Sequence, residues 1–315
     1  MGEDAEPTPP PLEPKARYRV GFCQRAAPGA WRDAQTANLH AEAARQHHDL
    51  LVETSDSVAA QIAAVERLAA AGVDALFLVP HADPEAARAV LAARDAGLPT
   101  VLFETAVDPN LAKAGRDYLC LIAADFAEQG RRCAQFLARV ADGKASILEL
   151  EGTAGTLRAK DRQRGFRGFL TGKVPGQKQG EGFPEMTILG AQVGNFDRAV
   201  GRAAFEALWA TYPEATAVFA HNDEMALGAI AAIRDAGEQP GETIVVVSIG
   251  GTRAGLAAIV GGDLSATCEW SPRYGPTAFL TLARHARGED LPDRVPNPDR
   301  FFDRSNARRH LDQPF

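Results

Sequence analysis

The segment VDALFLVPHADPEAARAVLAARDAGLPTVLFE (73–104) decides the fold class, because it contains one complete strand–helix–strand unit. Its apolar run ALFLVP (75–80) predicts a buried strand, an Ala-rich stretch of helical period follows, and TVLFE (100–104) predicts the next strand. Gly97 comes directly after the helix, where a left-handed backbone would make a Cβ clash. Strands that alternate with helices in this way are typical of a parallel sheet covered by helices.

The same layout occurs again in ATAVFAHNDEMALGAIAAIRDAGEQPGETIVVVSIG (215–250). Three features recur at a constant offset of 140 residues: His81 with His221, Asp83 with Asp223, and Arg-Asp-Ala-Gly at 94–97 and 234–237. Copies this far apart contain whole α/β units, whereas solenoids repeat every roughly 20–50 residues. We therefore expect an α/β fold of two similar lobes with parallel-sheet cores.

Apolar runs define the strands of both lobes. The predicted strands are 18–23, 49–54, 75–80, 100–104, 118–123, 146–151, 186–192, 217–221, 243–250 and 264–270. In open parallel sheets, ligands bind beyond the carboxyl ends of the strands. The residues at these ends are therefore the first candidates for a site: Gln24, His81, Glu104, Glu151, Asn222 and Gly250.

Composition limits the number of lobes and the class of partner. A chain of 315 residues, 45% of them hydrophobic, can fill two cores but hardly three. The net charge of −7 argues against nucleic acid, because binding phosphates needs clustered Lys and Arg. No apolar stretch approaches the roughly 20 residues of a membrane span. The patterns of serine hydrolases, zinc proteases and nucleotide-binding loops are missing, so we expect neither an enzyme nor a cofactor.

The first 16 residues, MGEDAEPTPPPLEPKA, are rich in proline and acidic residues and contain no apolar run. Such a segment cannot order itself by burial, so we interpret residues 1–16 as a flexible tether. The Met-Gly start suggests that a signal peptide or a lipid-attachment segment has been removed.

The cysteines Cys23, Cys120, Cys133 and Cys268 form no CxxC pair and have no histidine at zinc-finger spacing. Most lie within apolar runs, where cysteine behaves as a small hydrophobic residue. One disulfide stays open as an alternative and would fit an exported protein. We expect no metal site, because His81 and His221 fall in different lobes.

Six segments resemble the periplasmic sugar-binding proteins of the ribose-binding type, especially the galactofuranose-binding branch. They are GFCQRAAPGAWRDAQTAN (21–38), AGVDALFLVP (71–80), LELEGTAGTLRAKDRQRGF (148–166), GNFDRAVG (194–201), AVFAHNDEMALGAIAAI (217–233) and SATCEWSP (265–272). The resemblance implies two Rossmann-like lobes, a hinge with three chain crossings and a ligand held in the cleft. It also implies a monomeric periplasmic protein that delivers its ligand to an ABC permease or inner-membrane receptor.

The resemblance places the crossings near Ala124, Gly250 and Glu269. The first lobe would then comprise residues 17–124 and 251–268, and the second lobe residues 125–250 and 269–315. Closure of such lobes is a hinge motion that a ligand favours by touching both at once.

Five residues match ligand-binding positions of the resembled family: Trp31, Arg32, Arg162, Phe196 and Asn222. An indole or phenyl face suits the C–H side of a sugar ring, and a guanidinium or amide suits its hydroxyls. Four of them have a structural alternative: Trp31 packs on its lobe, Arg162 forms a surface ion pair with Asp161 or another acid, Phe196 lies in the core, or Asn222 caps a helix. Asp223 is the better capping candidate, and Arg158, Arg164 and Arg167 are expected to face water.

Four positions depart from the resembled pattern. Glu104 and Thr105 replace an Asp-Arg pair, Gly250 replaces an aspartate, and Trp270 replaces an amide or small polar residue beside Glu269. Losing charged hydrogen bonds, each worth about 1.5–3 kcal/mol, disfavours ribose or a common aldopyranose. We therefore expect a sugar, furanose or polyol as ligand. The alternative is a carrier or sensor for a larger, less polar, lipid-like molecule that bears a hydroxyl, with Glu104 accepting its hydrogen bond.

Overall fold

The computed structural model describes residues 8–27, 29–173 and 182–312. The chain forms two compact units, the first from Met1–Ala124 with Pro272–Pro298 and the second from Asp125–Ser271 with Asp299–Phe315. Each unit is built on its own six-stranded sheet. The predicted α/β class with two parallel-sheet lobes is confirmed.

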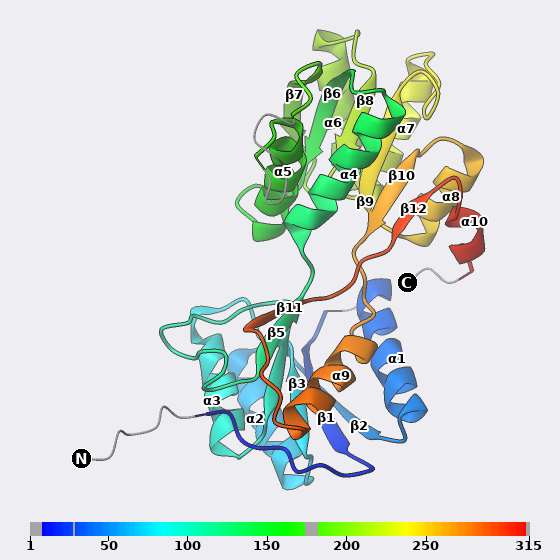
Figure 1. Cartoon of the computed structure of the whole chain (residues 1–315). Coiled ribbons are helices and arrows are strands. Elements are labelled where there is room, and N and C mark those ends of the chain that lie inside the picture. The colour runs from blue at the N-terminus through cyan, green and yellow to red at the C-terminus, as the bar shows by residue number, and fades with distance from the viewer. Residues whose placement is uncertain (1–7, 28, 174–181, 313–315) are drawn as a thin grey trace. The chain divides into compact units, whose positions relative to one another are not determined.

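The sheet of the first unit has the strand order β11-β5-β4-β3-β1-β2, with every recorded pair parallel. Its elements are β1 (Arg19–Arg25), α1 (Ala30–Arg45), β2 (Asp49–Ser55), α2 (Val58–Ala70), β3 (Ala75–Leu78), the 3₁₀ helix η1 (Pro84–Ala86), α3 (Ala87–Asp95), β4 (Thr100–Phe103), β5 (Cys120–Ala123), α9 (Gly275–Ala286) and β11 (Arg294–Pro296). Figure 1 shows α1 and α9 side by side in this unit.

The sheet of the second unit has the order β12-β10-β9-β8-β6-β7, and only β12 runs antiparallel to its neighbour among the described strands. Its elements are α4 (Phe126–Val140), β6 (Ala145–Glu151), α5 (Leu157–Leu170), β7 (Met186–Val193), α6 (Arg198–Thr211), β8 (Ala217–Ala220), α7 (Asp223–Asp235), β9 (Val245–Gly250), α8 (Arg253–Gly261), β10 (Ala266–Glu269), β12 (Phe301–Asp303) and α10 (Ala307–His310).

The internal repeat corresponds to the same topological place in both sheets. The first five strands of each unit follow one order, so β3-α3-β4 of the first unit matches β8-α7-β9 of the second. In this doubly wound order the connections change direction next to the first strand, which opens a crevice at the carboxyl ends. The repeat thus marks the two edges where ligand-binding residues are expected.

Both faces of each sheet are buried, which explains the nearly continuous apolar runs of the strands. In the second unit, Leu148, Val218 and Val246 pack in a core with residues of α6, α7 and α8, whereas Phe219 and Ile249 point to the opposite face, toward α4 and α5. The alternation follows from the two-residue period of a strand. Side chains that accept from backbone N–H groups begin several helices: Ser57, Asp125, Asp197, Asn222 and Thr252.

The boundaries expected after residue 250 differ from the structure. Residues 251–268 belong to the second unit, because β10 pairs with β9 and α8 packs against α7 and α10. Residues 272–298 belong to the first unit, because β11 pairs with β5 and α9 lies against α1. The crossings therefore follow Ala124, Ser271 and Pro298, so the crossing expected at Gly250 is wrong.

Residues 8–16 are packed on the first unit, so the expected tether is wrong for this stretch. Leu12 is buried in the core that contains Phe279. The His285 side chain donates a hydrogen bond to the Pro10 carbonyl over 2.9 Å, and Lys15 forms an ion pair with Asp74. Residues 1–7 of the predicted tether lie outside the described residues.

The cysteines are buried free thiols, as the hydrophobic interpretation expects, and the alternative of a disulfide is not realised. Burial raises the pKa of Cys23 to about 11 and that of Cys133 to about 12, so both stay protonated and unreactive near neutral pH. None of the helices in the described ranges is both long and apolar enough to cross a membrane.

Candidate functional site

Glu104 stands at the carboxyl end of β4 in a strained backbone conformation. Its φ is 65°, and the Thr105 N–H donates to the Phe103 carbonyl over 2.6 Å, which closes a γ-turn of the rare positive-φ type. A non-glycine residue in the left-handed region costs about 1–3 kcal/mol and is enriched at binding sites. The strain aims the Glu104 side chain at α1, while Thr105 is half-buried beside it.

The Glu104 carboxylate is surrounded by donors of its own unit. Arg32 donates to both of its oxygens, over 2.5 and 3.0 Å. Gln35 donates over 2.9 Å, and Arg25 lies 3.4 Å away. Arg32 therefore binds the Glu104 carboxylate through two parallel hydrogen bonds, although the Asp-Arg pair of the resembled pattern is missing.

Two donors of this group have no partner in the described chain, namely the buried Nε atoms of Arg25 and Arg32. Two arginines face one glutamate, so the group carries an excess positive charge. It can offer N–H donors to ligand oxygens. Glu104 is thus less available as an acceptor than the sequence suggested.

Trp31 is half-buried and packs on its own unit, as its structural alternative expects. Its ring meets Tyr274 edge-on, with ring centres 6.2 Å apart. The Arg32 guanidinium lies 5.2 Å from the indole centre. Packing against the unit and contact with a ligand are compatible for this residue, because part of the ring stays exposed.

Arg162 is the central residue of the second unit's group. Only 2% of it is exposed, and burial lowers its pKa to about 10. Its Nη1 donates to the His221 carbonyl over 2.7 Å and its Nε donates to Gln129 over 3.1 Å. Its Nη2 has no partner within the described residues. The alternative ion pair with Asp161 is not formed.

Three aromatic rings surround the Arg162 guanidinium. Its central carbon lies 5.3 Å from the ring centre of Phe126 and 5.9 Å from those of Phe196 and Trp270. Phe126 begins α4, Phe196 follows β7 and Trp270 follows β10, so three distant segments form the cluster. The cluster combines ring faces with an unused donor, which is the combination that a sugar needs.

Phe196 and Asn222 are linked to each other. Asn195 and Phe196 have φ values of 55° and 61°, and this turn lets the Phe196 carbonyl accept a hydrogen bond of 2.8 Å from the Asn222 amide. The Asn222 oxygen accepts from the Met225 N–H over 3.0 Å, which caps α7. Asn222 rather than Asp223 is therefore the cap, and half of its amide's hydrogen-bonding capacity remains for a ligand.

Asp223, the first residue of α7, is a buried acceptor that connects this helix with two strands, β9 and β10, and with the start of α8. It accepts from Ser248 over 2.6 Å, from Thr267 over 2.7 Å, and from the backbone and side chain of Thr252 over 2.8 Å each. A Cβ atom on Gly250 would come within 2.5 Å of this carboxylate. The Asp223 carboxylate thus occupies the place that a side chain at position 250 would need.

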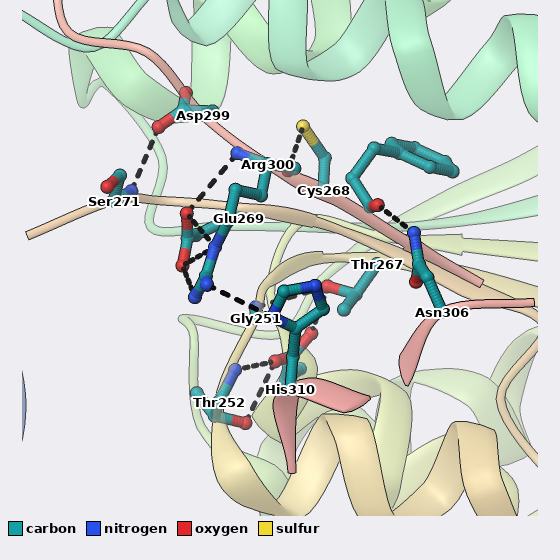
Figure 2. A network of polar contacts seen from close by, with 12 residues as sticks. Gly251, Thr252, Thr267, Cys268, Glu269, Ser271, Asp299, Arg300, Asn306 and His310 are labelled. Atoms are coloured by element: carbon teal, nitrogen blue, oxygen red, sulfur yellow. Dashed lines mark hydrogen bonds and ion pairs between the residues drawn. The ribbon is translucent and has the colours of Figure 1, made fainter. Parts of the chain in front are cut away.

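A second polar network holds the segment around Trp270 (Figure 2). The Glu269 carboxylate accepts from the Arg300 guanidinium at distances from 2.7 Å. Asp299 accepts from the Ser271 N–H over 2.9 Å. It also accepts from the Gln129 amide over 2.6 Å. Burial raises the pKa of Asp299 to about 6. Through Gln129, Asp299 is linked to Arg162.

The expectation that Arg158 faces water is wrong. Its guanidinium carbon lies 4.2 Å from the ring centre of Phe196 and 5.7 Å from that of Trp270. Arg164, in contrast, is exposed and paired with Asp161 over 3.0 Å. The spacing of Arg158 and Arg162 places both on one face of a helix, a signal that was present in the sequence.

No group of three or more His, Cys, Asp or Glu side chains in the described part of the chain could hold a metal ion. His81 lies 3.1 Å from the Ser55 hydroxyl in the first unit. His221 bonds with Glu149 over 3.0 Å in the second unit. Each histidine is thus occupied within its own unit.

A sequence profile described as the periplasmic binding protein domain matches residues 20–290. The chain belongs to the periplasmic binding protein family. The resemblance inferred from the six sequence segments is thereby confirmed.

This periplasmic binding protein is similar to proteins that differ in their sugars. The galactofuranose-binding protein of Escherichia coli (strain K12) is 29% identical over 285 residues, 89% of this chain and 86% of that protein. The arabinose ABC transporter's binding component from Shewanella sp. ANA-3, bound to α- and β-L-arabinofuranose, has 31% identity and a TM-score of 0.72, covering 94% of this chain and 95% of the other. A Mycobacterium smegmatis protein in complex with β-D-fucofuranose has 31% identity and a TM-score of 0.68, covering 94% of each chain.

Proposed function

We propose that this periplasmic binding protein is the sugar-binding component of an ABC importer, that its ligand is a furanose or another polar sugar, and that it catalyses no reaction. The similar proteins named above bind galactofuranose, arabinofuranose and fucofuranose. The less polar, lipid-like alternative finds no support among them. The proposed partner is an ABC permease in the inner membrane, reached by a monomer in the periplasm, with the first residues as an attachment segment.

The observation that carries the proposal is the buried Arg162 with its unpartnered Nη2. A buried unsatisfied donor costs about 1–3 kcal/mol, and an oxygen of a ligand would remove this cost. The rings of Phe126, Phe196 and Trp270 supply the apolar surface for the ring of a sugar.

The proposal assigns ligand contacts to both units. Trp31, Arg32, Glu104 and Thr105 are the proposed contacts of the first unit, and Arg162, Phe196, Asn222 and Trp270 are those of the second. Gly250, the last residue of β9, belongs to the proposed site through its backbone. Donors outnumber acceptors among these side chains, which favours ligands rich in oxygen.

The test is a thermal-shift and calorimetric screen of furanoses, pentoses, hexoses and polyols. Binding should stabilise the protein by RT ln(1 + [L]/Kd), which is about 2.7 kcal/mol at a hundredfold excess over Kd. The variant Arg162→Lys should lose this stabilisation, because a lysine lacks the guanidinium fork, whereas Arg164→Lys should keep it. A screen without any shift would refute the proposal, and so would unchanged affinity in Arg162→Lys.

A further inference from the structure

Two arginines of α5, Arg158 and Arg162, approach the same aromatic cluster. Both guanidinium groups lie within 6 Å of the ring centres of Phe196 and Trp270. Arg158 is half-buried and Arg162 is buried. Within the described residues, neither forms an ion pair with a carboxylate, although most arginines of this chain do.

The acids on the neighbouring elements are engaged elsewhere. Asp161 pairs with Arg164, Glu151 with Arg167 and Glu269 with Arg300. Asp223 accepts hydrogen bonds from hydroxyl and backbone N–H groups. Asp299 accepts from Gln129 and the Ser271 N–H. Asp299 attracts Arg162 electrostatically, but the two form no ion pair and are linked by hydrogen bonds through Gln129. The position at the end of β9 is Gly250, where the Asp223 carboxylate leaves no room for a side chain. The protein therefore brings two positive charges together, and within the described residues neither guanidinium is in direct contact with a carboxylate.

Two guanidinium groups so close together repel each other. Like charges four residues apart on a helix repel each other, and a buried charge without a counter-charge is costly. Aromatic faces offset part of this cost, because their electrons attract cations. They give no hydrogen-bond acceptor to the Arg162 Nη2, which stays unpartnered. An anionic oxygen of a ligand would supply both a hydrogen-bond acceptor for this Nη2 and a negative charge.

The residues of the first unit do not supply that charge. The Glu104 carboxylate is held by Arg32 over 2.5 Å and lies 3.4 Å from Arg25. Its charge is thus already matched by a cation of its own unit, with a second arginine in excess. Glu104 with Arg25 and Arg32 carries a net positive charge, as the pair of Arg158 and Arg162 does.

We propose that the sugar bound by this protein carries an anionic group, a carboxylate or a phosphate, and that Arg158 and Arg162 bind this group while Phe126, Phe196 and Trp270 contact the sugar. This inference rests on the proposed function, because it defines the chemical class of the sugar. Arg158 is then a specificity-determining residue. Two guanidinium groups offer planar donor pairs that match the oxygens of a carboxylate or a phosphate.

The test compares matched ligands by isothermal titration calorimetry. The probes are galactose, galacturonate and galactose 1-phosphate, with arabinose and arabinonate as a second series. We expect at least one anionic probe to bind tenfold or more tightly than its neutral counterpart, and the two anionic arms distinguish a carboxylate from a phosphate. This preference should shrink when the salt concentration rises, because ions screen partly exposed charges.

Variants of the same helix separate the charge of Arg158 from a structural role. Arg158→Gln should remove the preference for the anionic probe, and Arg158→Lys should retain part of it. Arg164→Gln removes an equal charge from an exposed position and should leave the preference unchanged. The melting temperature of each unliganded variant shows that the protein folds.

The outcomes distinguish this inference from the proposed function. Neutral sugars that bind as tightly as their anionic counterparts, or Arg158→Gln that keeps the preference, would overturn the inference and leave the importer role intact. If no probe of either kind and no other sugar binds the folded protein, the proposed function fails as well.

Discussion

Replacing Gly250 with alanine should destabilise the second unit, because a Cβ atom at this position would lie 2.5 Å from an oxygen and 2.6 Å from the carboxyl carbon of Asp223. The carboxylate cannot move freely, since it accepts four hydrogen bonds from Ser248, Thr252 and Thr267. Inserting a methyl group into a packed core costs about 1–3 kcal/mol. Weakening one hydrogen bond to a charged acceptor adds about 1.5–3 kcal/mol. We expect a total of about 3 kcal/mol.

Differential scanning calorimetry and urea unfolding measure this effect. For a unit of this size, about 3 kcal/mol corresponds to a fall of about 6–12 °C in the melting temperature. Gly261→Ala is the matched control, because its Cβ would meet only Asp263 at 3.6 Å and alanine is favoured over glycine inside a helix. If the free energy of unfolding of Gly250→Ala lies within about 0.5 kcal/mol of the wild-type value, the Asp223 carboxylate moves aside without loss of stability, and the expected clash is refuted.

Three further predictions address the site. Trp270→Ala should weaken binding of the best sugar probe about tenfold in calorimetry by removing one ring from the cluster; unchanged affinity would make the tryptophan a packing residue. Glu104→Gln should lower the melting temperature of the first unit by an amount equivalent to about 2 kcal/mol, because Arg32 and Arg25 lose their counter-charge, and an unchanged melting temperature would contradict this role. Asp299 has a pKa raised from 3.8 to about 6, so its contribution to stability is present below about pH 4 and is lost as the pH rises through about 6. In the wild type, the free energy of unfolding measured with urea should therefore fall by on the order of 2–3 kcal/mol between pH 4 and 6. The variant Asp299→Asn should lack this decrease, and a decrease that persists in the variant would contradict the raised pKa.

The sequence allowed the α/β class and the repeat to be predicted because both depend on local periodicity. The apolar composition of residues 75–80 indicates a buried strand, and the similarity of residues 215–250 to 73–104 is visible in the sequence itself. The short strands β11 and β12 were missed, because three-residue strands such as Arg294–Pro296 have no period to recognise. The lobe to which α8 and α9 belong was assigned wrongly, since an amphipathic helix does not encode which sheet it covers.

In the candidate site, too, features that depend on nearby residues could be predicted, and contacts between distant segments could not. Arg162 and Asn222 were recognised from motifs that surround them in the sequence. The proximity of Arg158 to Trp270 depends on α5 and the end of β10 meeting in space, which no local pattern records. The strained backbone at Phe196 is likewise a product of its surroundings, because an isolated phenylalanine avoids positive φ.

The position of α9 and β11 in the chain has a consequence for the order of folding. The first unit needs residues 272–298, which follow nearly all of the second unit in the sequence. Until they arrive, the face of the first sheet that contains Phe77 and Phe103 lacks the cover of Phe279. A nascent chain is therefore unable to complete its first unit before most of the second has been synthesised, so one face of the first sheet stays uncovered until translation is almost finished.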